Sequence, residues 1–227
     1  MKPLHYQAIL FDLDDTLYDL RSYWRGRLHE ALSMLGARYP QLDRDALIGR
    51  ALAEKVYIEK LPSFLRGLPI DDEPLIDEIH AAFARDWFAR LTLNDDAPAT
   101  LAQLRPYYRL GLVTNGPSRM QRPKIEQFRL DDYLDLLIVS EEVGVAKPDP
   151  AIFHLALERL GARAERPLYV GDSLEFDLPG AAAAGLPFIW MNPRHEPLPA
   201  HLPAPLATIE RLSELVGLLA NKPGAQK

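Results

Sequence analysis

The chain has 227 residues, of which 48% are hydrophobic, and this is enough for one sizeable core or for a core domain that carries a smaller insertion. The formal net charge is -6, and no segment gathers a strong excess of Lys and Arg. Sequence-independent nucleic-acid binding is therefore not expected, because it needs a basic patch. The absence of cysteine excludes disulfides, thiolate catalysis and cysteine-based zinc sites.

The first residues carry no targeting or membrane signal. Residues 1–7 are short and polar and lack the architecture of a signal peptide. No apolar stretch approaches the roughly 20 residues that span a bilayer. We therefore expect a soluble cytoplasmic protein with no membrane partner. The apolar run that follows, residues 8–11, predicts a buried strand that ends at Asp12.

From about residue 20 to residue 93 the pattern predicts helices. Apolar residues recur three or four positions apart, which fits a helix better than strict alternation does. Asp72 followed by Pro74 is typical of a helix start, and residues 46–58 form a less regular candidate. We expect the aromatic members of the pattern to form a core rather than a base-stacking platform. The apolar positions with this spacing are Trp24, Leu28, Leu32, Leu35, Ile76, Ile79, Phe83, Trp87 and Leu91.

Beyond residue 94 strands and helices alternate, which predicts a parallel sheet covered on both faces. The fold class is therefore α/β, a Rossmann-like parallel-sheet core (1–19 and 94–227) with an inserted α-helical bundle (20–93). We expect an extended surface loop over residues 192–205 and a disordered tail after Asn221. The predicted strands are 110–113, 136–139, 168–170 and 188–191, and the predicted helices are 119–128, 150–160, 178–184 and 210–220.

Polar segments follow the predicted strands, and their positions predict one site. In open parallel sheets, ligands bind beyond the carboxyl ends of the strands. Taken singly, each segment has a simpler explanation, because acidic residues after strands often cap helices or form turns and a lone lysine is usually solvated. Their joint occurrence in one order favours a reaction centre. The segments are Asp12-Leu13-Asp14-Asp15-Thr16, Thr114-Asn115-Gly116, Lys147-Pro148-Asp149-Pro150 and Gly171-Asp172-Ser173-Leu174-Glu175-Phe176-Asp177.

These segments resemble the four signature motifs of the haloacid dehalogenase (HAD) superfamily. DLDDT resembles its DxDxT motif, VTNG its hydroxyl motif, KPDP its lysine motif and GDSLEFD its GDxxxxD motif. The resemblance covers nearly the whole chain, and the helical insertion is similar to the family's C1 type of cap. It implies an HAD-like core with a cap domain. It also implies the phosphatase branch, because true haloacid dehalogenases lack the aspartate that stands here as Asp14.

The resemblance implies phosphoryl transfer through a covalent intermediate. The carboxylate of Asp12 attacks phosphorus and forms an aspartyl phosphate. Asp14 acts as acid for the leaving group and then as base for the hydrolytic water. Thr114 and the backbone N–H groups of Asn115 and Gly116 donate to the phosphoryl oxygens. Lys147 supplies a fixed positive charge close to the nucleophile and the phosphate.

Carboxylates that converge at one sheet edge also predict a metal ion. Two bare carboxylates about 4 Å apart repel by roughly 4 kcal/mol at an effective dielectric near 20, and a hard divalent cation removes this penalty. Magnesium suits few carboxylates, retained waters and a phosphate oxygen. By the resemblance, the Mg²⁺ ligands are the Asp12 carboxylate, the Asp14 backbone carbonyl and the Asp172 carboxylate. Asp177 would act from behind these ligands or through water.

We therefore predict magnesium-dependent hydrolysis of a small phosphate monoester, such as a nucleotide or a sugar phosphate. A metal-free 2-haloacid dehalogenase, a phosphomutase and a non-enzymatic HAD-like binding module remain as alternatives. Asp14 disfavours the first, and the full set of catalytic groups disfavours the last. A helical cap could exclude water and contact the leaving group. Candidate contact residues are Tyr18, Arg21, Arg25, Tyr57, Lys60, Arg66 and, from the core, Arg119.

Overall fold

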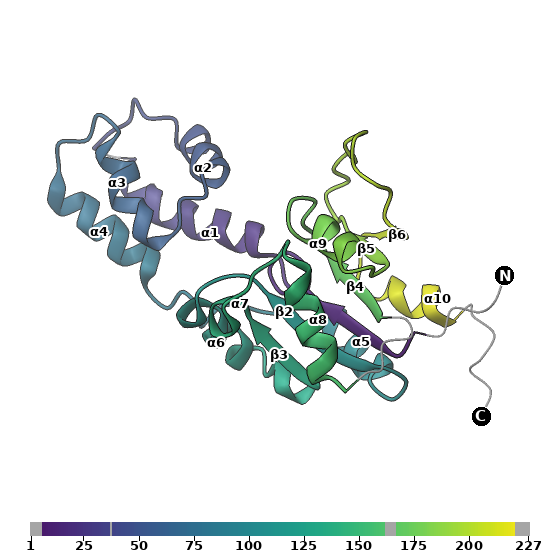
Figure 1. The fold of residues 1–227 in the computed structure, drawn as a ribbon. Coiled ribbons are helices and arrows are strands. Elements are labelled where there is room, and N and C mark those ends of the chain that lie inside the picture. Colours follow the sequence, from purple (N-terminus) through teal and green to yellow (C-terminus); the bar gives the residue numbers. More distant parts are fainter. Residues whose placement is uncertain (1–5, 37, 162–166, 221–227) are drawn as a thin grey trace. The chain divides into compact units, whose positions relative to one another are not determined.

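The computed structural model describes residues 6–36, 38–161 and 167–220. Within these residues, six strands form one sheet in the order β3-β2-β1-β4-β5-β6, and every neighbouring pair is parallel (Figure 1). The α/β fold class predicted from the sequence is confirmed. The strands are β1 (Ala8–Phe11), β2 (Arg109–Thr114), β3 (Leu136–Val139), β4 (Pro167–Gly171), β5 (Phe188–Met191) and β6 (Ala207–Ile209).

The central strands are apolar throughout because both faces of the sheet are covered. Every residue of β1, β4 and β5 is buried. Strands of this kind read as continuous apolar runs rather than as alternating patterns. The edge strand β6 is three residues long and only Ile209 in it is buried, so it gave no comparable run and was not predicted.

Strand β1 lies where the strand order reverses. It pairs with β2 on one side and with β4 on the other, with Phe11 opposite Leu112 and Val170. The carboxyl ends of these three strands therefore meet at a topological switch point, where open α/β sheets bind their ligands. The segments that follow the three strands start at Asp12, Asn115 and Asp172.

Helices cover both faces of the sheet. Helices α8 and α9 contact each other and share a core with Leu10 and Tyr169. The neighbouring Ile9 points to the opposite face, where it is also fully buried. The helices of this unit are α5 (Ala97–Leu104), α6 (Ser118–Gln127), α7 (Ser140–Val143), α8 (Pro150–Arg159), α9 (Asp177–Ala183) and α10 (Glu214–Ala220), with the 3-10 turn η3 (Leu130–Asp132).

Four of these helices were predicted, whereas α5 and the single-turn α7 were not. Helix α10 begins at Glu214 and is shorter than the predicted 210–220. Residues 192–206 contain no helix or strand, as predicted for the proline-rich loop. The predicted disorder after Asn221 lies outside the described residues. Every helix in the described part of the chain is too short or too polar to span a bilayer.

The contacts divide the chain into two units, Met1–Asp19 with Thr92–Lys227 and Leu20–Leu91. The second unit is helical and has its own core. The aromatic residues Trp24, Phe83 and Trp87 are buried in it, as expected for core residues. Its elements are α1 (Leu20–Leu32), η1 (Ser33–Leu35), α2 (Arg44–Ala53), η2 (Ile58–Lys60), α3 (Leu61–Arg66) and α4 (Glu73–Ala84).

Helix α4 begins as predicted but ends early. The Asp72 carboxylate accepts the backbone N–H of Leu75 at 3.0 Å, which caps the helix start. The helix stops at Ala84, so the prediction that the pattern continues as helix to Leu91 was wrong. The buried guanidinium of Arg27 donates to three carbonyl groups at this end and satisfies them without a further turn. The apolar residues beyond the end stay buried, so their spacing reflects the core rather than a helix.

Candidate functional site

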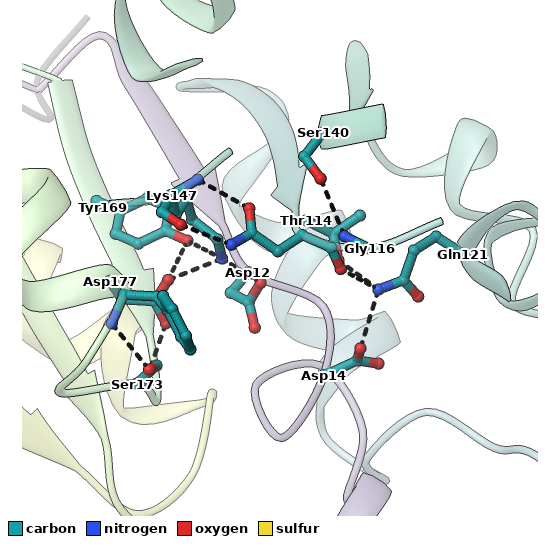
Figure 2. Close-up of polar contacts among 12 residues, drawn as sticks. Asp12, Asp14, Thr114, Gly116, Gln121, Ser140, Lys147, Tyr169, Ser173 and Asp177 are labelled. Carbon is teal, nitrogen blue, oxygen red and sulfur yellow. Dashed lines mark hydrogen bonds and ion pairs between the residues drawn. The ribbon is translucent and has the colours of Figure 1, made fainter. Parts of the chain in front are cut away.

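The carboxylate of Asp12 lies against the buried ammonium of Lys147 (Figure 2). Lys147 Nζ donates to Asp12 Oδ1 at 2.5 Å, to Asp177 Oδ1 at 2.7 Å and to the hydroxyl of Tyr169 at 2.9 Å. The Tyr169 hydroxyl donates in turn to Asp177 Oδ1 at 2.8 Å. Lys147 is only 5% exposed, so it is not the solvated surface lysine of the simpler explanation. All three N–H groups of its ammonium have acceptors, which fixes its position.

Glycine at position 171 permits the close approach of Asp177. A Cβ atom on Gly171 would lie 2.4 Å from Asp177 Oδ2, which is far inside van der Waals contact. That oxygen accepts the backbone N–H of Ser173 at 2.9 Å. Because its other oxygen is held by Lys147 and Tyr169, the Asp177 carboxylate is engaged on both sides. It therefore supports the site rather than acting only as a cap of the helix that follows.

The charges around Lys147 are not balanced. Burial raises the pKa of Asp12 to about 7, although the ammonium of Lys147 acts in the opposite direction. Burial, together with the charges of Asp12 and Asp177, raises the pKa of Asp172 well above its usual range. Burial alone would lower the pKa of Lys147, but the facing carboxylates raise it, so this lysine stays protonated. One ammonium thus faces more negative charge than it can neutralise.

The unbalanced carboxylates fit a hard metal cation. Oxygen atoms of Asp12, Asp172 and Asp177 all lie within 4.8 Å of one another. Since both oxygens of Asp177 already accept hydrogen bonds, Asp12 and Asp172 are the better placed ligands. A donor set made only of oxygen is the set that magnesium, calcium and manganese prefer. The residues present therefore fit a divalent cation of this type.

The second motif holds neighbouring loops as well as offering donors. Thr114, the last residue of β2, is buried at the carboxyl end of the strand. The Asn115 side chain donates to the backbone carbonyl of Lys147 at 2.8 Å and accepts its backbone N–H at 2.8 Å. The backbone N–H of Gly116 donates to the hydroxyl of Ser140 at 3.0 Å. The Asn115 amide therefore positions the lysine loop, and the Gly116 N–H already has an acceptor.

Asp14 points into a different set of contacts. Lys124 Nζ donates to its two carboxylate oxygens at 2.7 and 3.0 Å, and Gln121 Nε2 donates to Oδ2 at 3.0 Å. The hydroxyl of Tyr18 donates to Oδ1. Burial acts to raise the pKa of Asp14, but the charge of Lys124 and these hydrogen bonds outweigh it and lower the pKa. The carboxylate is therefore ionised at neutral pH.

The structure thus gathers the predicted residues into two adjoining groups. Asp12, Lys147, Asp172 and Asp177 form one group. Asp14 belongs to the other, which Gln121 joins to Thr114 (Figure 2). The side chain of Asp14 is not part of the carboxylate cluster, and only its backbone carbonyl was predicted as a ligand.

Three residues that contribute hydrogen bonds to the site were not predicted from the sequence. The sequence predicts Tyr169 as one member of an apolar strand, and only its phenol group indicates a buried hydrogen bond. Gln121 and Lys124 lie three residues apart on α6, on the same buried face as Ile125. Polar residues at core positions of an amphipathic helix were the available signal. Of the residues predicted to contact the leaving group, Tyr18 donates to Asp14, and Arg66 pairs with Glu73 at the surface. Their contact with a leaving group stays a prediction.

The chain is similar to several known proteins. Residues 6–185 match the family model described as haloacid dehalogenase-like hydrolase. The chain is 44% identical to pyrimidine 5'-nucleotidase YjjG of Escherichia coli (strain K12) over 124 residues, which are 54% of this chain and 55% of that protein. It is 28% identical over 231 residues to N-acylneuraminate-9-phosphatase of Rattus norvegicus, covering 94% of this chain and 93% of that protein. A solved structure, the HAD hydrolase YfnB of Bacillus subtilis bound to magnesium, superposes with a TM-score of 0.73 at 26% identity, covering 95% and 99% of the two chains.

Proposed function

Since the chain belongs to the haloacid dehalogenase-like hydrolases, we propose that it is a magnesium-dependent phosphatase that acts through an aspartyl phosphate on Asp12. The resemblance to this family that the four motifs indicated is confirmed, and the named relatives are phosphatases. The observation that carries the proposal is the buried contact between Asp12 and Lys147 beside a second, poorly compensated carboxylate, Asp172.

In this proposal Asp12 acts as the nucleophile. Only the ionised carboxylate attacks phosphorus, and Lys147 favours that form at 2.5 Å. The carboxylates of Asp12 and Asp172 would hold Mg²⁺, with the Asp14 backbone carbonyl as the third protein ligand. When bound, the ion supplies positive charge that favours ionised Asp12 and neutralises the phosphoryl oxygens. The Thr114 hydroxyl and the backbone N–H of Asn115 would donate to these oxygens, and the Lys147 ammonium would act on them through its positive charge.

The proposed reaction has two steps, and each step forms one bond to phosphorus and breaks another. In the first, a bond forms between an Asp12 oxygen and phosphorus, the bond to the leaving oxygen breaks, and that oxygen takes a proton from Asp14. In the second, Asp14 removes a proton from water, the water oxygen attacks phosphorus, and the bond to Asp12 breaks. The lowered pKa of Asp14 keeps its carboxylate ionised, which is the form that the second step requires. For the first step it must be protonated, and a monoester whose second pKa is near 6 can bring that proton.

The proposed substrate is a small soluble monoester. The two relatives above are named for a pyrimidine nucleotide and for an acylated sugar phosphate, and both are of the size that a cap can enclose. We propose that residues 20–93 form this cap and select the leaving group, while the α/β unit carries the chemistry. This division of labour would place specificity in the insertion and catalysis in the motif residues.

A substrate panel tests the proposal directly. Purified protein with magnesium is incubated with nucleoside monophosphates, sugar phosphates and phosphoglycolate, and released phosphate is measured. We expect release from at least one ester, loss of activity with a chelator, and recovery on addition of magnesium. Full activity in a thoroughly metal-free sample would refute the proposal. Halide release from a 2-haloacid without metal would favour a dehalogenase. Conversion of the ester into an isomeric phosphate ester, without release of inorganic phosphate, would favour a phosphomutase.

A further inference from the structure

Helix α6 turns two polar side chains toward the catalytic edge. Gln121 is 2% exposed and Lys124 is 4% exposed. They lie three residues apart, so they occupy adjacent positions on one helix face. Polar groups at this depth require partners, because leaving them unsatisfied is costly. The partners of Gln121 Nε2 and Lys124 Nζ are residues of the proposed active site, whereas Gln121 Oε1 has no partner in the described part of the chain.

Lys124 holds both oxygens of a single carboxylate. Its Nζ lies 2.7 Å from Asp14 Oδ1 and 3.0 Å from Asp14 Oδ2. Two contacts from one ammonium fix the position of the carboxylate, and they also oppose its rotation about the bond to Cβ. The centroid of the Tyr18 ring lies 5.7 Å from the same ammonium, and this cation–π contact also holds the lysine in place.

Gln121 joins Asp14 to the second motif. Its Nε2 lies 3.0 Å from Asp14 Oδ2, 3.1 Å from Thr114 Oγ1 and 2.5 Å from the backbone oxygen of Asn115 (Figure 2). A side-chain amide has two hydrogens, so it shares them among three acceptors. These acceptors come from the loop after β1 and from the last residue of β2 with the residue that follows it. Gln121 therefore sets the distance between the carboxylate of Asp14 and the hydroxyl of Thr114.

We propose that Gln121 and Lys124 are positioning residues that hold the Asp14 carboxylate beside Thr114, in the orientation that proton transfer requires. The inference rests on the proposed phosphatase function, in which Asp14 serves both chemical steps. Neither residue need touch the substrate, since each acts through Asp14. Misplacing a catalytic group by about 1 Å can cost about a hundredfold in rate.

A positioning role and a purely structural role predict different kinetics. If the two residues only stabilised α6, their loss would reduce the hydrolysis of all esters in proportion. If they position Asp14, the loss must depend on the leaving group. An alkyl phosphate needs proton donation to its leaving oxygen, whereas a dinitrophenyl phosphate releases a stable anion and needs little. With the aryl ester, the slow step becomes the hydrolysis of the aspartyl phosphate, which still needs Asp14 as base.

The experiment compares Lys124→Met and Gln121→Met with Arg122→Met. The first two remove the contacts to Asp14 while keeping an unbranched side chain. The third removes a positive charge from the same helix, where Arg122 pairs with Glu142 near the surface. The substrates are 2,4-dinitrophenyl phosphate and the best alkyl phosphate of the panel, with magnesium present. Thermal melting of each variant checks the fold.

We expect kcat/KM for the alkyl ester, which reports formation of the aspartyl phosphate, to fall about tenfold to a hundredfold in both test variants. This is less than most of the roughly 10²-fold to 10⁴-fold that general acid–base catalysis contributes, because Asp14 is misplaced rather than removed. The fall in kcat/KM for the aryl ester should be at least about fivefold smaller. Its kcat should become limited by hydrolysis of the aspartyl phosphate, which gives a lower KM and a burst of dinitrophenolate close to one per active site. The double variant should lose less than the product of the single losses, because both residues act on one carboxylate. Arg122→Met should show neither the split nor the burst.

Equal losses of kcat/KM for the two esters without a burst would overturn the inference. The same difference between the two esters in Arg122→Met would also overturn it. If Lys124→Met does not fold, Gln121→Met decides alone, since it introduces no unpaired charge. Asp12→Asn, measured in parallel, separates this inference from the proposed function. Activity retained in Asp12→Asn would refute the phosphatase mechanism itself. Inactive Asp12→Asn together with proportional losses at Gln121 and Lys124 would refute only the positioning role.

Discussion

Two buried lysines, Lys124 and Lys147, contact Asp14 and Asp12, and the charges around the two lysines differ. Lys147 contacts Asp12 and Asp177, with the Asp172 carboxylate in the same cluster, whereas Lys124 contacts Asp14. Around Lys147 the carboxylates outnumber the ammonium, and the pKa values of Asp12 and Asp172 are raised. Around Lys124 one carboxylate meets one ammonium, and the pKa of Asp14 is lowered.

This difference separates a cation site from a self-sufficient ion pair. An excess of buried carboxylate is destabilising until a further positive charge arrives, so the Lys147 cluster is the group of residues that could hold a divalent cation. The pair of Asp14 and Lys124 needs no such addition. The count of acidic residues is therefore a weaker sign of a metal site than the deficit of positive charge around them.

The largest expected effect is the loss of the nucleophile at the first cluster. Asp12→Asn should reduce turnover by about 10⁴-fold or more, because the amide cannot form the aspartyl phosphate. The fold should survive, since Lys147 keeps Asp177 as its partner. Steady-state phosphate release and thermal melting measure the two effects. A variant that keeps more than a few per cent of the wild-type rate would contradict the assignment.

Replacing each lysine should have unequal effects on stability. Lys147→Met should destabilise the metal-free protein by about 3–5 kcal/mol, because it leaves buried carboxylates without their cation. Lys124→Met should cost less, since the side chain of Asp14 is 27% exposed and can meet water, whereas that of Asp177 is fully buried.

Urea denaturation with and without magnesium measures this difference. Magnesium should recover part of the stability of Lys147→Met and none of the specific loss in Lys124→Met. Equal recovery in both variants would show that the two lysines do not differ in the way that their carboxylate neighbours suggest.

Magnesium itself should stabilise the wild-type protein through the first cluster. At about 100 times its dissociation constant a ligand adds about 2.7 kcal/mol, which corresponds to a rise in Tm of roughly 5–10 °C for a chain of this size. Asp172→Asn should abolish most of this shift. Asp14→Asn is the matched control and should keep it, because the side chain of Asp14 faces Lys124 rather than the carboxylate cluster. A shift lost in Asp14→Asn but kept in Asp172→Asn would reverse the assignment.

The sequence predicted the first cluster better than the second. Asp12, Lys147 and Asp172 stand at or beyond the ends of strands, and the parallel order of the strands suffices to bring such positions to one edge. The partners Gln121 and Lys124 depend on which face of α6 packs inward, and this is decided by contacts distant in the chain. A local pattern shows that the face exists but not what it meets.

The limits of periodicity are visible in the helical unit as well. Trp87 and Leu91 continue the apolar spacing of α4 and are buried, yet the helix ends at Ala84. The backbone of Asp86 takes a φ of 50°, which a continuing helix does not allow. Burial is what the apolar pattern records, and a turn can satisfy it as well as a helix can. Short elements such as β6 and α7 hold too few residues to produce a pattern at all.

The smallest expected effect comes from Arg122, which is partly exposed on α6, whereas Lys124 on the same helix is buried. Arg122 pairs with Glu142 at 2.5 Å, with side chains 37% and 30% exposed. The hydrogen bond to Arg122 lowers the pKa of Glu142 from its ordinary value of 4.5 to about 2. Because solvent screens such a pair, Arg122→Met should cost about 1 kcal/mol or less at pH 7.

The pH dependence of that small loss follows from the direction of the shift. A carboxylate with a lowered pKa in the folded state contributes its stability above the unfolded value, and the contribution falls as the pH drops from about 4.5 toward about 2. The stability difference between wild type and Arg122→Met should therefore be constant from pH 7 to pH 5 and shrink toward pH 3, as measured by urea denaturation. Glu142→Gln is the partner control and should show the same narrowing. A difference that grows on acidification would mean that the contact with Glu142 is not what Arg122 contributes, and the contrast between the inner and outer faces of α6 would then need another cause.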